Sequence, residues 1–137
     1  MSLSGLTVTG GQTSGYGGGI YANGATVTLR DVMLTRNSAS FGGGLYNYHG
    51  TTRLLNTIVS GNVASGTSGA DRGGGMYLAG GDATVVNSVL CGNFGEYGGA
   101  IYHYTGTLTV TNSTIAGNQT QTQGGGIYEI SHHYYSS

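Results

Sequence analysis

One five-residue phrase recurs along the chain: Gly-Gly-Gly-Ile-Tyr at Gly17–Tyr21, Gly-Gly-Gly-Leu-Tyr at Gly42–Tyr46, Gly-Gly-Gly-Met-Tyr at Gly73–Tyr77, Gly-Gly-Ala-Ile-Tyr at Gly98–Tyr102 and Gly-Gly-Gly-Ile-Tyr at Gly124–Tyr128. An asparagine stands sixteen residues after each of the first four tyrosines. The stretch from that asparagine to the next tyrosine varies from 9 to 15 residues. A fixed segment joined to a variable one is typical of a repeating unit with one insertion-tolerant loop, and this period of 25–31 residues indicates a solenoid.

Each repeat consists of short runs in which apolar and polar residues alternate, separated by corners rich in Gly, Asn and Asp. The expected second corner of each repeat is Asp31, Asn56, Asn87 or Asn112. Runs this short, with period two, predict strands rather than helices. The candidates for the inward face are Val27, Leu29, Thr52, Leu54, Ala83, Val85, Leu108 and Val110 in the first run, Leu34, Val59, Leu90 and Ile115 in the second, and Ile20, Leu45, Met76, Ile101 and Ile127 in the third. The sequence therefore predicts an all-β solenoid of about five rungs, each with three short parallel strands.

Stacking of equal rungs turns equivalent residues into ladders. The expected structural ladder of asparagines, whose amides can both donate and accept along the stack, is Asn37, Asn62, Asn93 and Asn118. The second glycine of each phrase is expected at a tight bend or a packing point without room for a side chain. These glycines are Gly18, Gly43, Gly74, Gly99 and Gly125.

The tyrosines of the phrases flank inward aliphatic residues, so alternation places them on the outer face of the solenoid. This candidate ligand-binding strip comprises Tyr21, Tyr46, Tyr77, Tyr102 and Tyr128. Tyr48 and Tyr104 would widen it. Such a strip could bind sugar rings or a partner protein, or its rings could serve only to stabilise the sheet by stacking.

The motifs resemble those of the right-handed parallel β-helix (pectate-lyase-like) superfamily, and most closely the repeats of polymorphic outer-membrane proteins, marked by Gly-Gly-Ala-Ile and Phe-x-x-Asn. Gly98–Ile101 matches the first mark. The second is matched, with an aliphatic residue in place of Phe, at Leu34–Asn37, Val59–Asn62, Leu90–Asn93 and Ile115–Asn118. The resemblance covers about residues 3–128 and implies a right-handed coil. It also implies a bacterial protein that is secreted or on the cell surface, adhesin-like or active on polysaccharides.

Composition narrows the classes of partner. Only 7% of the residues are charged and the net charge is −1, which argues against nucleic acid and anionic membranes as partners. No apolar run approaches the roughly 18 residues of a membrane span. No signal peptide is visible after Met1, so the sequence leaves the compartment open. The single Cys91 excludes an internal disulfide.

The residues give little support for catalysis. No two of the five acidic residues occupy one ladder position in adjacent rungs, so neither a calcium site nor a carboxylate pair is expected. His49 and His103 lie beside tyrosines two rungs apart, at different offsets. We expect no catalytic residues, no metal site and no cofactor. A polysaccharide lyase or hydrolase is the alternative, and threonines on the first strand leave ice binding as a minor one.

The chain is expected to be one domain over residues 1–137, with repeats over 3–128 and an irregular tail over 129–137. It lacks an N-terminal capping helix and a translocation barrel, which indicates a fragment or small relative of a bacterial surface repeat protein. Uncapped solenoid ends expose core and strand edges. We therefore expect homo-oligomers joined through the ends, unless Tyr134 and Tyr135 fold over the C-terminal core. The expected function is structural or ligand binding, without enzymatic activity.

Overall fold

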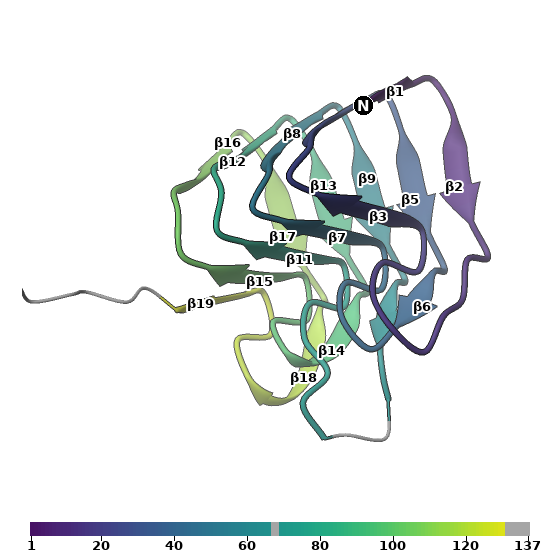
Figure 1. Cartoon of the computed structure of the whole chain (residues 1–137), viewed down its shortest axis with the longest axis vertical. Coiled ribbons are helices and arrows are strands. Elements are labelled where there is room, and N and C mark those ends of the chain that lie inside the picture. Colours follow the sequence, from purple (N-terminus) through teal and green to yellow (C-terminus); the bar gives the residue numbers. More distant parts are fainter. Residues whose placement is uncertain (67–68, 131–137) are drawn as a thin grey trace, which may run out of the picture.

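The computed structural model describes residues 1–66 and 69–130, and all regular secondary structure in them is β-strand. The strands form four parallel sheets wound around one axis, as a solenoid of about five turns (Figure 1). Sheet A contains β1 (Ser2–Ser4), β4 (Thr26–Arg30), β8 (Thr51–Leu55), β12 (Ala83–Val86) and β16 (Leu108–Thr111). Sheet B contains β2 (Thr7–Thr9), β5 (Met33–Thr35), β9 (Ile58–Ser60), β13 (Val89–Cys91) and β17 (Thr114–Ala116). The predicted all-β solenoid is confirmed.

The other two sheets lie on either side of the glycine phrases. Sheet C contains β6 (Ser38–Ala39), β10 (Val63–Ala64), β14 (Phe94–Tyr97) and β18 (Gln119–Gln123). Sheet D contains β3 (Ile20–Asn23), β7 (Leu45–Tyr48), β11 (Met76–Ala79), β15 (Ile101–Tyr104) and β19 (Ile127–Ile130). The three predicted runs correspond to sheets A, B and D. Sheet C adds a fourth strand to the last four rungs, whereas the first rung has only an isolated bridge from Gln12 to Ser38. The prediction of three strands omitted it because it lies in the variable segment, where length and alternation differ between repeats.

The register between rungs is strict wherever the repeat is constant. In sheet A, Val27 pairs with Thr52, Thr52 with Ala83 and Ala83 with Leu108. The only register shift in these pairings lies between Gly95 and Tyr97 in sheet C, opposite the longer β18. A fixed register means that each sequence position forms a straight column of side chains.

The inward columns of sheets A, B and D fill a narrow core. Leu29, Leu54 and Val85 have no exposed surface, and each such buried side chain contributes about 1.5–3 kcal/mol. The same columns open at the last rung, where Val110 and Ile127 are each 37% exposed. No described strand stacks on that rung, so its inward residues keep one side in solvent.

Left-handed backbone makes the corners. The second corner has φ of 55° at Asp31 and about 48° at its asparagine equivalents, a conformation that short polar side chains tolerate. The bend and the close packing that were both expected at the second glycine of each phrase fall on two successive glycines. Gly42 turns the chain with φ of 66°, whereas a Cβ on Gly43 would meet the backbone carbonyls of Val63 and Gly74.

The strands extend slightly beyond the expected repeats. β1 begins at Ser2, and β19 continues through Glu129 and Ile130, beyond the Tyr128 that ends the last phrase. The remaining tail, with Tyr134 and Tyr135, lies outside the described residues. Over the part of the chain that is described, no helix is long and apolar enough to cross a membrane.

Candidate functional site

The asparagines sixteen residues after the tyrosines form a column between sheets B and C, which is buried except at Asn118. In each step, the backbone N–H and the Nδ2 of one asparagine both donate to the Oδ1 of the next. For Asn62 these bonds to Asn93 are both 3.0 Å, and its Nδ2 also donates to the Leu34 carbonyl at 2.8 Å. Gly11 occupies this position in the first rung, where its N–H donates to Asn37 Oδ1 at 2.9 Å. This column is saturated with internal partners, so its role is structural.

The five tyrosines of the phrases stack as one continuous ladder on the outer face of sheet D. Successive ring centroids lie 5.5, 5.0, 4.9 and 5.4 Å apart, with interplanar angles of 4–17°. We call Tyr21, Tyr46, Tyr77, Tyr102 and Tyr128 the tyrosine ladder. Because each inner ring has a neighbour on both faces, a ligand can stack only on the ends of the ladder.

Exposure along the tyrosine ladder is uneven. Tyr21 is 56% exposed, whereas Tyr46 is 9% and Tyr102 only 2% exposed. The strip of five rings expected from the sequence is therefore closed at Tyr46 and Tyr102, and Tyr77 and Tyr128 are partly exposed. Tyr48, the neighbour of Tyr46 on the same face, is 40% exposed, and its ring lies 6.3 Å from the Tyr46 ring.

A second column covers the tyrosine ladder. We call it the outer row; it comprises Tyr16, Phe41, Arg72 and Tyr97. Each member contacts the ladder tyrosine of the next rung: Tyr16 lies 4.8 Å from Tyr46, Phe41 5.8 Å from Tyr77, Arg72 Cζ 5.3 Å from Tyr102, and Tyr97 5.4 Å from Tyr128. The outer row is the reason that Tyr46 and Tyr102 are buried and that Tyr77 is partly covered.

The outer row is not among the residues predicted from the sequence, although a signal exists. Each member stands five residues before the tyrosine of its own phrase, and Gln123 holds that position in the last rung. Isolated parallel bridges link Tyr16 to Phe41, Phe41 to Arg72 and Arg72 to Tyr97. The bridging backbone fixes the column in register, in the same way as the longer strands.

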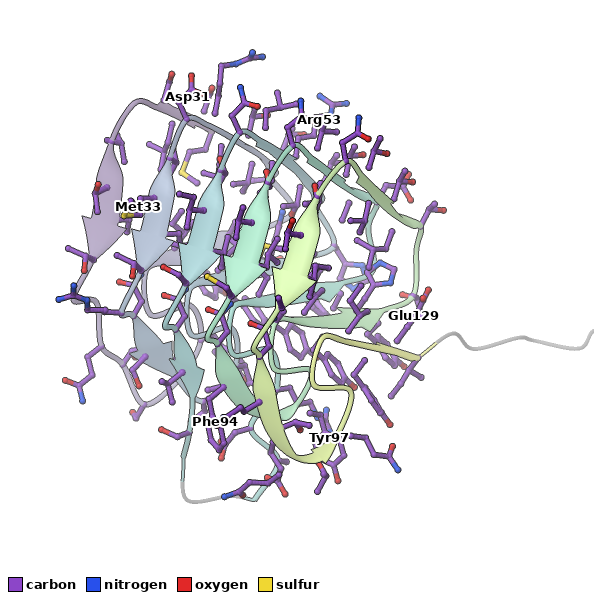
Figure 2. All side chains as sticks on the ribbon, turned by 180° about the vertical axis from the view of Figure 1, so that it is seen from behind. Asp31, Met33, Arg53, Phe94, Tyr97 and Glu129 are labelled. Atoms are coloured by element: carbon purple, nitrogen blue, oxygen red, sulfur yellow. The ribbon has the colours of Figure 1, made fainter. Side chains whose placement is uncertain are left out.

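Arg72 is the one charged side chain in the two columns, and a pocket lies beside it. This Arg72 pocket has a volume of about 160 Å³ and is lined by Arg72, Tyr97, Tyr102, Tyr128 and Ile130. The guanidinium lies over the Tyr102 ring in a cation–π contact. Tyr97 marks this side of the solenoid in Figure 2. The pocket thus combines one cation with phenol rings.

The buried phenols resist ionisation. Burial, and then the neighbouring phenols, raise the pKa of Tyr46 to about 12. Burial also raises the pKa of Tyr77 and of Tyr102, while the nearby Arg72 charge opposes the shift. At neutral pH the raised pKa values keep these three hydroxyl groups uncharged.

The remaining ionisable side chains do not gather into a second centre. His103, fully buried, has its Nδ1 3.4 Å from Oε1 of Glu129, without hydrogen-bond geometry. Asp31 lies at the top of Figure 2, well apart from Glu129. Asp82 Oδ1 accepts from the Thr107 N–H at 3.1 Å. Within residues 1–66 and 69–130, no three His, Cys, Asp or Glu side chains could hold a metal ion.

A larger opening of about 340 Å³ lies at the corner between sheets A and B, lined in part by Leu6, Val32 and Met33. The outer face of sheet A offers no regular threonine array, because Arg53 stands in register between Thr28 and Thr84.

No protein-family model matches the chain, and neither a curated protein nor a solved structure gives a significant match.

Proposed function

We propose that this protein is a non-enzymatic binding solenoid that recognises a glycan at its tyrosine face. One observation carries the proposal: three exposed phenol rings, Tyr16, Tyr21 and Tyr48, gather at the N-terminal end of the tyrosine ladder, each at least 40% exposed. The Tyr16 and Tyr21 ring centroids are 6.5 Å apart and tilted by 53°.

The chemistry of these rings favours a sugar. An aromatic ring has a negative face, against which the weakly positive C–H bonds of a sugar ring can pack, and the phenol hydroxyl supplies a hydrogen bond beside it. The surface around them carries almost no charge, and the patch is made of rings rather than aliphatic side chains. A protein partner would be expected to require a larger apolar core.

Binding of oligosaccharides to ¹⁵N-labelled protein tests this proposal, with neutral glucose, N-acetylglucosamine and galactose oligomers and their acidic counterparts as probes. We expect shifts of the amide resonances of Tyr16, Tyr21 and Tyr48, and loss of binding in Tyr21→Ala. Thr109→Ala on the outer face of sheet A is the control and should bind normally. If no oligosaccharide binds, or Tyr21→Ala binds as well as the wild type, the glycan proposal is wrong.

The alternative, a lyase or hydrolase, makes a different prediction. Such an enzyme would require carboxylates or a metal close to the bound sugar, whereas the outer row and the tyrosine ladder contain no acidic residue. We expect no unsaturated ends or reducing ends to be released from polyuronates or neutral glycans, with or without calcium. Product formation by pure protein would replace the binding proposal with the enzymatic one.

We further propose kinship with the bacterial surface solenoids whose repeats the chain resembles. The Gly-Gly-Ala-Ile phrase at Gly98–Ile101, in register with the other glycine phrases, supports this relationship. Antibody labelling of intact cells of the source organism provides the test. Labelling only after permeabilisation would argue against a surface location.

A further inference from the structure

We infer that the Arg72 pocket binds a single anionic group, so that the preferred ligand is a largely neutral glycan ending in one acidic sugar. The inference rests on the proposed function, since it assigns the charged end of the same ligand surface. Arg72 is held in register by the backbone, has no acidic partner among the described residues, and carries the only charge in the outer row and the tyrosine ladder.

The backbone of Arg72 is held by two hydrogen bonds to the preceding rung, and a parallel bridge pairs it with Tyr97 of the following rung. Its N–H donates to the Ser40 carbonyl at 3.1 Å, and its carbonyl accepts from Gly42 N–H at 2.9 Å. The half-buried side chain lies over Tyr102 and donates a hydrogen bond to the Tyr77 hydroxyl. Rigid placement matters because the planar guanidinium fork binds an oxyanion through two parallel hydrogen bonds only when it is correctly oriented.

Arg72 has no acidic partner in the described chain. Over residues 1–66 and 69–130, the only ion pair is between His103 and Glu129. The neighbouring Asp71 is buried, and one of its carboxylate oxygens lies near Gly66, where it accepts no hydrogen bond from the described residues. A half-buried cation without a counter-ion gains more from an arriving anion than an exposed one, because water has already been partly removed.

The size of the pocket suits a small group. At about 160 Å³, it has room for a carboxylate and part of one sugar ring. Tyr97, Tyr102 and Tyr128 provide the ring walls. The pocket therefore offers one cation for one acidic group, with phenol rings beside it. This composition is expected for a site that binds a terminal acidic sugar.

The absence of further charge along the strip selects against polyanions. Between the Arg72 pocket and the exposed rings at Tyr16 and Tyr21, the two columns contain only tyrosine and phenylalanine. A polyuronate would place a carboxylate on each sugar against these uncharged rings, and each would lose hydration without gaining a cation. A neutral chain with one acidic end avoids that loss.

Calorimetric titration with a matched pair of probes tests the inference: a sialylated tetrasaccharide of otherwise neutral sugars and the same chain without its sialic acid. We expect the wild type to bind the acidic probe about 10–100-fold more tightly, as for one charge-assisted pairing. In Arg72→Gln this preference should vanish while the affinity for the neutral probe remains. Gln is suited to the position, because Gln123 occupies it in the last rung.

Arg53→Gln is the matched control, since it removes an exposed arginine from sheet A and should retain the preference. Near-ultraviolet circular dichroism checks folding, and Tyr128→Phe is a second pocket variant that should weaken the binding of the acidic probe only.

If the wild type binds both probes equally, or Arg72→Gln keeps the preference, this inference is wrong while glycan binding stands. If polyuronate binds more tightly than the singly charged probe, the preference for one anion is also wrong. Failure of both probes together would instead contradict the proposed function.

Discussion

At the scale of single residues, the asparagine column makes the sharpest stability prediction. Replacing Asn62 by Ala removes the Oδ1 that accepts from both the N–H and the Nδ2 of Asn37, at 3.0 and 3.1 Å. These donors are buried, so the loss should destabilise the protein by about 2–4 kcal/mol. Asn118→Ala should destabilise less, because that site is half exposed and water can substitute. Urea unfolding provides the measurement, and equal losses in the two variants would contradict the argument.

The raised pKa of Tyr46 predicts how stability falls in alkali. A phenol with a pKa of about 10 in the unfolded chain and about 12 in the fold stabilises the fold below pH 10, because the folded state binds the proton more tightly. That contribution is lost as the pH rises from 10 to 12. Tyr46→Phe lacks this titration, so its stability should fall less over the same interval. Urea midpoints measured across this range test the prediction, and parallel curves for the two proteins would refute it.

At the scale of elements, the sequence predicts a strand wherever the repeat has constant length. Sheets A, B and D arise from alternation that is repeated at equal spacing, which is why Val27, Leu34 and Leu45 could be placed inside. Sheet C could not be found in this way, since β6 spans two residues and β18 five. Its strands form because neighbouring rungs supply backbone partners, and such support comes from tertiary contacts rather than from local pattern.

In the first four phrases, the second glycine lies so close to neighbouring backbone that a side chain there should destabilise the fold. An Ala at position 43 would bring its Cβ to 2.5 Å from the Gly74 carbonyl oxygen, and closer still to that of Val63. Backbone on both sides cannot move without separating rungs, so Gly43→Ala should destabilise by about 3 kcal/mol or more. Gly15→Ala is the control, since its Cβ would meet only Thr13 Oγ1 at 3.9 Å. Thermal unfolding measures both, and a normal melting temperature for Gly43→Ala would disprove the close approach.

At the scale of the whole molecule, the candidate site depends on how rungs overlap. The tyrosine ladder follows from the repeat, but the burial of its rings follows from contacts between residues one rung apart, such as Tyr16 with Tyr46. The Arg72 pocket likewise needs β15 and β19 beside the outer row. A single repeat contains neither relationship. The sequence could therefore predict the column of rings and could not predict which rings a ligand reaches.

The last rung predicts how the molecule associates. On the described chain no strand stacks on β16, β17 or β19, and the inward side chains Val110 and Ile127 are partly exposed there. We propose that two copies meet through these C-terminal ends. A head-to-tail contact is less favourable, because Gly11 at the other end has no Oδ1 to accept from Asn118.

Sedimentation velocity over a range of concentrations tests this association. We expect the wild type to form dimers at micromolar concentration, and Ile127→Lys to be monomeric, because a charge at the centre of the contact would be desolvated without a partner. Val89→Lys is the control: Val89 has nearly the same exposure, 36%, but faces outward on sheet B. A two-fold dimer closes on itself, so the wild type should not grow further with concentration. Continued growth into larger species would indicate head-to-tail stacking instead, and a wild type that stays monomeric would show that the exposed core at this end is tolerated or covered within one chain.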